Sequence, residues 1–442
     1  MTELKNVKKI RTDILIVGSG AAGLYCALKL PKEKQIVIIT KEDAESSDSF
    51  LAQGGMCVLK SEDDYDSYFE DTMRVGHYKN RKESVDIMIR SSQNIVKELI
   101  GYGVEFEQEN GKLLYTREGG HSTHRIVFHE DITGKEITSK LLAAVKKCEN
   151  VKLLEYTTMI DLLTDGKTCA GAVTVDKAGT KQVIEAEDTV LACGGLGGLY
   201  EHSTNFRHLT GDALAIALSH DIQLENIDYI QIHPTTLYSK KPGRRFLISE
   251  SVRGEGAILL DKNGNRFVNE LQPRDVVAAA VLAQPTGKAW LLIDDKLVKS
   301  NKLAAGYVSQ GLMVSGKNVD ELAKAMGVPA KNLKATMDQY QKAFETKKDE
   351  AFGRPEMVVA NNVWPMYAVQ ITPAIHHTMG GVRINKNAEV IGVTAKPIPG
   401  LYAAGEVTGG VHGGNRIGGN AVADIITFGR IAGANAANYM TK

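Results

Sequence analysis

The chain has 442 residues, of which 43% are hydrophobic and 24% are charged. This length exceeds that of one ordinary hydrophobic core and predicts two or three domains, and the composition is ordinary for a soluble globular protein. Lys+Arg and Asp+Glu both number 53, so the formal net charge is +0. That balance argues against a partner that is a nucleic acid or a membrane surface.

The five cysteines are scattered, and no pair has C-x-x-C spacing. This pattern argues against disulfides, zinc, an iron–sulfur cluster or covalently attached haem, so we expect no metal site. The N-terminus has no apolar signal region, and no stretch is long enough to span a membrane. We therefore expect a cytoplasmic protein; no pattern in the sequence indicates an oligomeric state.

Residues 13–41 have the pattern of a βαβ unit. The apolar run 13–17 predicts a buried parallel strand, residues 21–30 predict a helix, and residues 35–40 predict a second strand. Between the first strand and the helix stands the G-x-G-x-x-G motif of dinucleotide-binding proteins, formed by Gly18, Ser19, Gly20, Ala21, Ala22 and Gly23.

Each position of this motif requires glycine for a different physical reason. Gly18 permits the tight turn, Gly20 lets the backbone approach a pyrophosphate, and Gly23 lets helix and strand pack closely. The acidic residue that usually ends the second strand is replaced by Thr40-Lys41. The motif predicts a bound dinucleotide but leaves its identity open.

Two later loops combine glycines with polar side chains. Residues 46–56 are small and polar and end in Gln53-Gly54-Gly55-Met56. They predict either a surface loop or, so close behind a dinucleotide turn, the neighbour of a flat ring system. Residues 116–122 place an arginine, Glu118 and a histidine around two glycines, which is a plausible ligand loop.

The middle of the chain predicts helices and strands that return to the nucleotide domain. Apolar residues at helical spacing predict a helix near 87–100, and a further helix is expected over 135–147. Strands are expected at 151–154, 169–175 and 184–193, the last entering a cluster that begins with Gly194 and Gly195. Asp212 then opens another predicted helix.

From His233 to about residue 350 the pattern changes. A hairpin is expected at 260–269, a strand at 290–293, and helices at 319–326 and 330–346. This stretch predicts an inserted domain that covers the nucleotide domain as a lid. His233 precedes a proline at a strand end, where a lone histidine is more often exposed than functional.

Three glycine-rich patches follow, and they carry His376, Glu406 and Arg416 among their glycines. The last patch opens an apolar helix over 421–437, and a helix N-terminus preceded by glycines is suited to an anion or a carbonyl-bearing ring. Close packing between layers would explain the glycines. It would not explain the polar residues between them.

Together these patches, in this order from Asp13 to Lys442, resemble the flavoprotein family of succinate dehydrogenase, fumarate reductase and L-aspartate oxidase. The resemblance implies an α/β fold and FAD rather than NAD as cofactor. It implies a Rossmann-like FAD-binding domain made of residues 1–232 and 351–442, with an α+β capping domain inserted at 233–350. The C-terminal helical domain usual in L-aspartate oxidases is not expected here.

By position, the resemblance assigns FAD contacts to the glycine motif of residues 18–23 and to glycine-containing regions later in the chain. Asp48 occupies the place where membrane-bound relatives attach FAD through a histidine, so the cofactor is expected to be non-covalent. The further expected FAD contacts are Lys41, Ser49, Ala52, Gln53, Gly54, Gly55, Gly194, Gly195, Asp212, His377, Glu406, Asn420, Ala421 and Val422.

The resemblance also implies a C4 dicarboxylate bound between FAD and the cap. Arg274 matches the residue that moves a proton to or from the substrate carbon. Because arginine has a pKa above about 12, it needs paired acids to act this way, and Glu250 with Arg253 is the expected relay. The matching carboxylate-binding set is His233, Ser249, His376, Arg416 and Gln231.

Two substrates remain open on these grounds. Residues 116–122 resemble L-aspartate oxidases, in which the acid matching Glu118 faces the α-ammonium of L-aspartate. That reading implies oxidation of L-aspartate to iminoaspartate with fumarate or O₂ as acceptor, at the first step of NAD biosynthesis, and a functional link to quinolinate synthase. The C-terminal half instead resembles soluble fumarate reductases of the flavocytochrome c type, and relatives acting on other unsaturated acids remain a lesser alternative.

Overall fold

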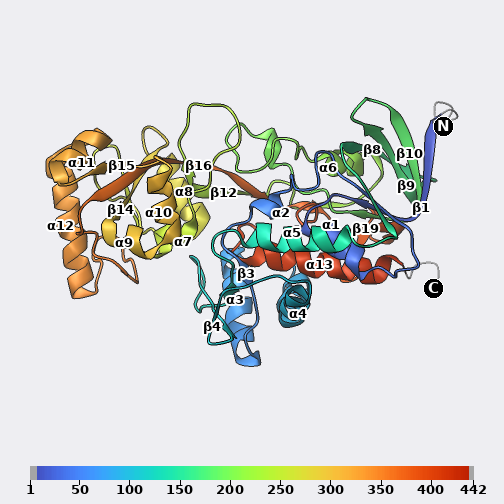
Figure 1. Cartoon of the computed structure of the whole chain (residues 1–442), viewed down its shortest axis with the longest axis horizontal. Helices are drawn as coiled ribbons and strands as arrows, with labels where there is room; N and C mark the ends of the chain where they lie inside the picture. The colour runs from blue at the N-terminus through green and yellow to red at the C-terminus, as the bar shows by residue number, and fades with distance from the viewer. Residues whose placement is uncertain (1–6, 438–442) are drawn as a thin grey trace.

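The computed structural model describes residues 7–437. It is an elongated molecule with a large α/β body at one end and a smaller α+β body at the other (Figure 1). The apolar cores agree with this division. One core joins buried residues 14–222 with residues 382–436, and two smaller cores lie within residues 248–371.

The larger body is built on an eight-stranded sheet in the order β18-β19-β10-β1-β2-β7, with β8 and β9 joined to β10. The neighbours from β19 to β7 are parallel. Strands from both halves of the chain therefore share one sheet. Its members are β1 (Lys8–Val17), β2 (Ile36–Ile39), β7 (Val151–Leu154), β8 (Thr157–Thr164), β9 (Cys169–Asp176), β10 (Lys181–Leu191), β18 (Glu389–Ile391) and β19 (Pro397–Ala403).

Helices cover this sheet, and two of them cross at a distance that only glycine allows. Gly429 and Gly433 of α13 rest on the backbone of Ala22 and Cys26 in α1, where an added Cβ would meet carbonyl oxygens at 2.6 Å and 2.4 Å. The helices of this body are α1 (Ala21–Lys29), α2 (Asp48–Leu51), η2 (Glu62–Asp64), α3 (Tyr65–Val75), α4 (Lys82–Gly101), α5 (Thr133–Val145), η3 (Gly197–Leu199), α6 (Asp212–Ser219) and α13 (Asn420–Ala436).

Short two-stranded sheets connect loops of the larger body. They pair β3 (Met56–Cys57) with β6 (Ile126–Val127), β4 (Gln108–Glu109) with β5 (Lys112–Leu113), and β11 (Leu224–Glu225) with β17 (Gly381–Val382). The first of these pairs joins the loop after the glycine turn to the loop that carries Glu118.

The smaller body, which we call the cap, has an antiparallel sheet in the order β12-β16-β14-β13, with β15 on β16. Its strands are β12 (Ile230–Leu237), β13 (Ile258–Leu260), β14 (Ala289–Asp294), β15 (Val314–Gly316) and β16 (Met366–Thr378). The helices are α7 (Glu250–Gly254), α8 (Arg274–Leu282), α9 (Asp295–Ser300), α10 (Lys302–Ser309), α11 (Val319–Met326) and α12 (Ala330–Thr346).

The predicted fold class, an α/β FAD-domain architecture with an α+β insertion, is confirmed, with two differences in detail. The segment between the strands expected at 151–154 and 169–175 contains a further strand, β8. The stretch of small residues at 46–56, a poor helix by composition, contains the one-turn helix α2. β8 pairs with β9 in the sheet, and α2 packs against α5.

The boundaries 1–232, 233–350 and 351–442 remain a proposal. Strand β16 lies beyond residue 350, yet it pairs with β12, β14 and β15 of the cap sheet. We therefore propose that the cap extends to the end of β16. Within residues 7–437, no helix combines the length and apolar character needed to cross a membrane.

Substitution of glycine by alanine should change the melting temperature in opposite directions at two helical glycines, because only one of them lies at the crossing of α1 and α13. Gly101→Ala, at an open position of α4, should raise the melting temperature, since alanine is favoured over glycine in helices by about 0.5–1 kcal/mol. Gly429→Ala should lower it, because overpacking commonly costs about 1–3 kcal/mol. Differential scanning fluorimetry of the holoprotein compares them; an unchanged or raised melting temperature for Gly429→Ala would contradict the close-contact argument.

Candidate active site

A single cavity runs from the glycine turn between β1 and α1, past the N-terminus of α13, to the cap. Most of the residues expected from the sequence lie on its wall. From the larger body these are Gly18, Ser19, Gly20, Ala21, Ala22, Lys41, Ser49, Ala52, Gln53, Gly54, Gly55, Glu118, Gly194, Asp212, Glu406, Arg416, Ala421 and Val422. From the cap and the end of β16 come His233, Ser249, Glu250, Arg274, His376 and His377.

The glycine turn has the geometry that its sequence predicts. Gly18 has a φ of 119°, and a Cβ there would lie 2.1 Å from the carbonyl oxygen of Ala192, the residue after β10. A Cβ on Gly23 would lie 2.1 Å from the carbonyl oxygen of Gly18, so Gly23 serves the packing of α1 on β1 and not the cavity. Gly20 is the N-cap residue of α1.

Two helix N-termini face this cavity. The N-cap residues, Gly20 of α1 and Gly419 of α13, have no side chain to cap the helix, and neither first turn contains an acidic residue. In α1 the N–H of Ala21 donates to Ser49 Oγ at 2.9 Å. Further first-turn N–H groups and the positive end of each helix dipole face the ligand space. The buried Gln53 Oε1 between them also lacks a partner. The residues fit a long ligand that has a diphosphate in its middle and a carbonyl-bearing ring at one end, as FAD does.

The opposite end of the cavity from the cap holds an ion pair. Lys41 Nζ lies 2.7 Å from Asp212 Oδ2 and donates to Thr210 Oγ1 at 2.8 Å. The wall there also includes Thr157, Thr158 and Met159 of β8. Sequence reasoning missed these three residues because the strand itself was not expected.

Two buried acids lie along the middle of the cavity wall. Asp48 accepts hydrogen bonds from the backbone N–H of Phe206 at 3.0 Å and from the Asn205 amide. Glu406 accepts from the backbone N–H of Thr378 at 2.8 Å. Burial raises the pKa of Asp48 to about 7, and burial together with Asp48 raises the pKa of Glu406 to about 8. The raised pKa values reduce the negative charge that these acids carry into the cavity near neutral pH.

At the cap end, Arg274 is the centre of a buried charge cluster. As the first residue of α8, it lies 2.6 Å from Glu250 Oε2 through Nε and 2.9 Å from Glu118 Oε2 through Nη2. Glu250 also lies 2.9 Å from Arg253 Nη2. The cations around Glu250 outweigh its burial and lower its pKa to about 2. Arg274, Glu250 and Arg253 thus form the continuous chain that the sequence predicted.

Glu118 lies on a loop and not on a helix or strand, yet its carboxylate is held closely. A Cβ on Gly418 would lie 1.7 Å from Glu118 Oε2, and a Cβ on Gly54 would lie 1.9 Å from Oε1. Two glycines therefore leave the space that this side chain fills. Burial, and then the nearby Glu250, raise the pKa of Glu118, while Arg274 opposes the shift.

Gln231 connects the two arginines that face the cavity. Its Oε1 accepts from Arg274 Nη1 at 3.1 Å and from Arg416 Nη2 at 2.9 Å. Arg416 Nε is buried without a hydrogen-bond partner and is available for a ligand. Burial, and then the neighbouring Arg274, lower the pKa of Arg416 to about 9, so it is still a cation at neutral pH.

The histidines of the site are buried and neutral. His233, for which exposure was the expectation from its place before a proline, is only 1% exposed, although β12 is the end strand of the cap sheet and pairs with β16 alone among the named strands of the described residues. Its ring contacts that of His376 edge to face, with the two ring centroids 5.1 Å apart. Burial lowers the pKa of both, and for His233 the arginines add to this effect. These two histidines can offer hydrogen bonds to a carboxylate, and the arginines offer the charge.

Five of the expected residues lie behind the cavity wall in the described part of the chain: Gly23, Gly195, Gln231, Arg253 and Asn420. Gln231 and Arg253 still reach the site through their bonds to wall residues. Asn420 instead bonds Tyr68 and Thr72 of α3, which fixes the start of α13. A contact between Asn420 and the cofactor gains no support from this arrangement.

Sequence reasoning missed three polar residues of the cap end. Thr204 Oγ1 lies 2.8 Å from His376 Nδ1, and Asp131 accepts a hydrogen bond from Ser249 Oγ at 3.0 Å. Arg244 lies on the cavity wall. The run Lys240 to Arg245, two lysines and two arginines around Pro-Gly, was the signal for Arg244. Nothing in the local pattern distinguished Thr204.

Comparison with known proteins agrees with this site. The sequence model of an FAD binding domain matches residues 13–422. An L-aspartate oxidase of Clostridium perfringens is 35% identical over 95% of this chain and 85% of its own length. A fumarate reductase (cytochrome) of Shewanella frigidimarina is 36% identical over 97% of this chain and 78% of its own length.

Among solved structures, the open conformation of a flavocytochrome c3 fumarate reductase matches with a TM-score of 0.81 and 34% identity. The match covers 98% of this chain and 79% of that one. A 3-ketosteroid Δ1-dehydrogenase matches with a TM-score of 0.77 at 18% identity, which shows the fold alone. The chain therefore belongs to the family of FAD-dependent oxidoreductases that contains the L-aspartate oxidases and the fumarate reductases.

Proposed function

We propose that this protein is an L-aspartate oxidase, which oxidises L-aspartate to iminoaspartate with bound FAD and passes the electrons to fumarate or O₂. The observation that carries the proposal is the buried carboxylate of Glu118, 2.9 Å from Arg274 in the same cavity as the carboxylate-binding set. The similarity to L-aspartate oxidases over nearly the whole chain supports it.

Glu118 matters because L-aspartate differs from succinate by one α-ammonium group. A buried ammonium is costly unless it is paired with an anion. In the ligand-free cavity Glu118 is paired with Arg274. A zwitterionic amino acid can replace both halves of this pair, because its carboxylate can take Arg274 and its ammonium can take Glu118. A plain dicarboxylate leaves Glu118 without a cation.

We propose that the two carboxylates of the substrate are held by the arginines and by neutral donors. Arg416 offers a fork that can bind a carboxylate through two parallel hydrogen bonds. Gln231 fixes its direction through the bond to Arg416 Nη2. The remaining contacts are assigned to His233, Ser249 and His376, which lie on the same part of the wall.

Proton transfer is assigned to the chain from Arg274 through Glu250 to Arg253. Bound FAD supplies the acceptor for the hydride that leaves the substrate carbon. Burial lowers the pKa of Arg274, but Glu250 and Glu118 outweigh it and the net shift is upward, so at rest Arg274 is a cation. The pKa of Arg253 is lowered by burial, against the effect of Glu250. Arg253, at the far end of the relay, thus gives up a proton more readily than Arg274.

The proposal includes non-covalent FAD, since Asp48 stands where relatives attach the cofactor and is held by Asn205 and Phe206. We place the reaction in the cytoplasm, as the first step of NAD biosynthesis, with iminoaspartate used by quinolinate synthase. The alternative is a fumarate reductase, or a related reductase of an unsaturated acid. The observation that favours it is the 36% identity with the fumarate reductase of Shewanella frigidimarina.

An anaerobic half-reaction tests the proposal directly. Mixing the purified yellow holoprotein with L-aspartate without oxygen should abolish the flavin absorbance near neutral pH, and fumarate added next should restore it. Absorbance spectra in a stopped-flow instrument follow both steps. If L-aspartate leaves the spectrum unchanged while a chemical reductant and fumarate complete a cycle, the fumarate reductase reading replaces this one.

Glu118→Gln should separate the two activities. Because the substitution removes the only partner proposed for the ammonium, kcat/KM for L-aspartate should fall about 100-fold, whereas fumarate reduction should change far less. Burial raises the pKa of Glu118, so the wild-type KM for L-aspartate should rise as the pH falls towards that raised pKa. The exposed Glu345→Gln in α12 is the control; equal losses in both activities would refute the role of Glu118.

Arg274→Gln should damage both directions. A positioned acid or base contributes about 10²- to 10⁴-fold, so aspartate oxidation and fumarate reduction should each fall by about 1,000-fold. The flavin content, read from the absorbance spectrum after gel filtration, should stay near one per chain. A variant that loses flavin, or retains one of the two activities, would argue against a shared proton path.

A further inference from the structure

Glu118 depends for its position on a loop without helix or strand, and the structure shows what holds this loop. The loop from Thr116 to Arg125 is closed at its base, where Arg125 N donates to Thr116 O at 3.1 Å and Thr116 N donates to Ile126 O at 2.9 Å. The eight residues 117–124 lie between these two ends. Only Glu118 of this loop is on the cavity wall among the described residues.

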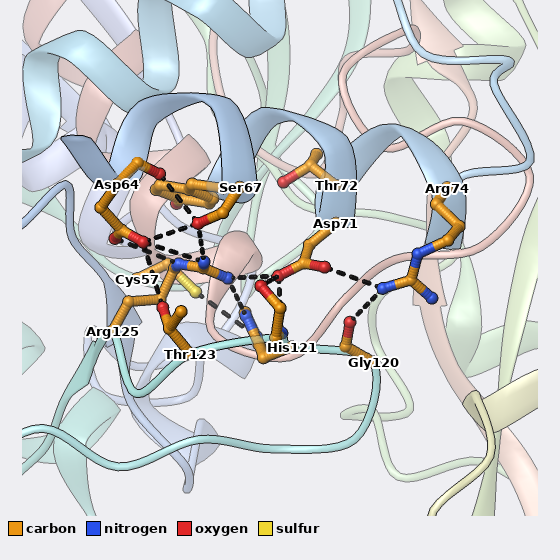
Figure 2. Close-up of polar contacts among 12 residues, drawn as sticks. Cys57, Asp64, Ser67, Asp71, Thr72, Arg74, Gly120, His121, Thr123 and Arg125 are labelled. Atoms are coloured by element: carbon orange, nitrogen blue, oxygen red, sulfur yellow. Dashed lines mark hydrogen bonds and ion pairs between the residues drawn. The ribbon is translucent and has the colours of Figure 1, made fainter. Parts of the chain in front are cut away.

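Helix α3 anchors the far side of the loop through a buried arginine (Figure 2). The Arg125 side chain is fully buried and lies 3.1 Å from Asp64 and 2.7 Å from Asp71. Asp71 Oδ2 also accepts from Ser122, both from N and from Oγ, at 2.7 Å. Arg74 donates to the Gly120 carbonyl at 2.7 Å. The loop is therefore fixed to one face of α3 on both sides of His121.

The same arginine sets the tautomer of His121. Arg125 Nη1 lies 3.0 Å from His121 Nδ1, and an arginine can only donate hydrogen bonds, so Nδ1 must be the acceptor. The ring proton is then on Nε2, which lies 2.9 Å from the carbonyl oxygen of Gly418 and donates to it. Burial, with the charge of Arg125, lowers the pKa of His121 to about 4, so the ring is neutral at physiological pH.

The hydrogen bond from His121 to Gly418 joins the loop that carries Glu118 to the loop that carries Arg416. These are the acid and one of the cations of the proposed substrate site. Gly418 follows Arg416 by two residues, and it is the glycine against which the Glu118 carboxylate packs. Cys57 Sγ also donates to Gly418 O, at 3.2 Å, and its backbone N donates to Gly419 O. Figure 2 shows Cys57 and His121 approaching each other from different segments.

We propose that His121 is a positioning residue for substrate selection, whose Nε2–H bond to Gly418 holds the Glu118 loop at a fixed spacing from the Arg416 loop. This inference rests on the proposed function, since Glu118 and Arg416 are the groups assigned to the ammonium and a carboxylate. His121 itself touches neither FAD nor substrate, and it is absent from the cavity wall within residues 7–437. Its effect passes through Glu118.

Two substitutions separate the two bonds of the His121 ring. Gln can place an N–H near the position of Nε2 and keep the bond to Gly418, whereas Asn can replace only the acceptor at Nδ1. His121→Asn should raise KM for L-aspartate about tenfold and change fumarate reduction by less than about threefold, and His121→Gln should stay within about threefold of wild type in both. His220→Asn, at the C-cap of α6 beside Asp161, is the matched control.

A double-mutant cycle distinguishes positioning from general damage. If His121 acts through Glu118, adding His121→Asn to Glu118→Gln should lower kcat/KM for L-aspartate by less than about twofold further. A full additional loss, or equal losses in aspartate oxidation and fumarate reduction by His121→Asn alone, would overturn the proposal. Flavin content and melting temperature are measured for each variant to confirm that it is folded.

The tautomer gives a readout that does not depend on activity. In the holoprotein labelled with ¹⁵N-histidine, the His121 signals, assigned by their loss in His121→Gln, should show a protonated Nε2 and an unprotonated Nδ1 near neutral pH. A charged ring or the other tautomer overturns the inference and leaves the proposed function standing. A wild-type protein that has this tautomer but does not oxidise L-aspartate overturns the proposed function, and the selection role with it.

Discussion

The ion pair between Arg274 and Glu118 is the contact on which the site depends. Arg274 begins α8 in the cap, and Glu118 lies on a loop of the larger body, so the pair joins the two bodies across the cavity. Both side chains are 8% exposed, and removing one partner of such a buried pair typically costs about 3–5 kcal/mol. A ligand that separates this pair must therefore either supply both replacement charges or bind with Glu118 protonated. This requirement restricts the ligand before any shape is considered.

Glycine makes the rest of the arrangement feasible, and for different reasons at different positions. Gly54 and Gly418 leave space for the Glu118 carboxylate, whereas Gly429 lets α13 rest on α1. The second contact sets where the uncapped N-terminus of α13 lies relative to that of α1. Two helix ends that both need an anion or a carbonyl are thereby held on one cavity. The same residue type thus serves the substrate, the cofactor and the packing of the layers.

The sequence predicted the residues whose chemistry is local and missed those whose role comes from distant partners. The turn at Gly18 and the helices at 319–326 and 330–346 follow from spacing and residue type, and the structure contains them. Arg274, Glu250 and Arg253 were implied by the family resemblance, and ion pairs join their side chains in the structure. His233 was expected to be exposed because a proline follows it, yet it is buried on β12, which pairs with the distant β16. His121 stood beside Glu118 in the sequence, but its bond partner, Gly418, is 297 residues away.

Charge balance explains how one site can handle both an amino acid and its unsaturated counterpart. Near neutral pH the histidines His233 and His376 are neutral, so the charges of the cluster around Arg274 come from Arg253, Arg274 and Arg416 against Glu118 and Glu250, which leaves this cluster one net positive charge. L-Aspartate, with two carboxylates and one ammonium, neutralises it. Fumarate carries one more negative charge, and the raised pKa of Glu118 makes that residue the acid that can accept the compensating proton. In the proposed function, Glu118 is ionised when the amino acid is bound and protonated when fumarate is bound, so that the complex of this cluster with either ligand carries no net charge.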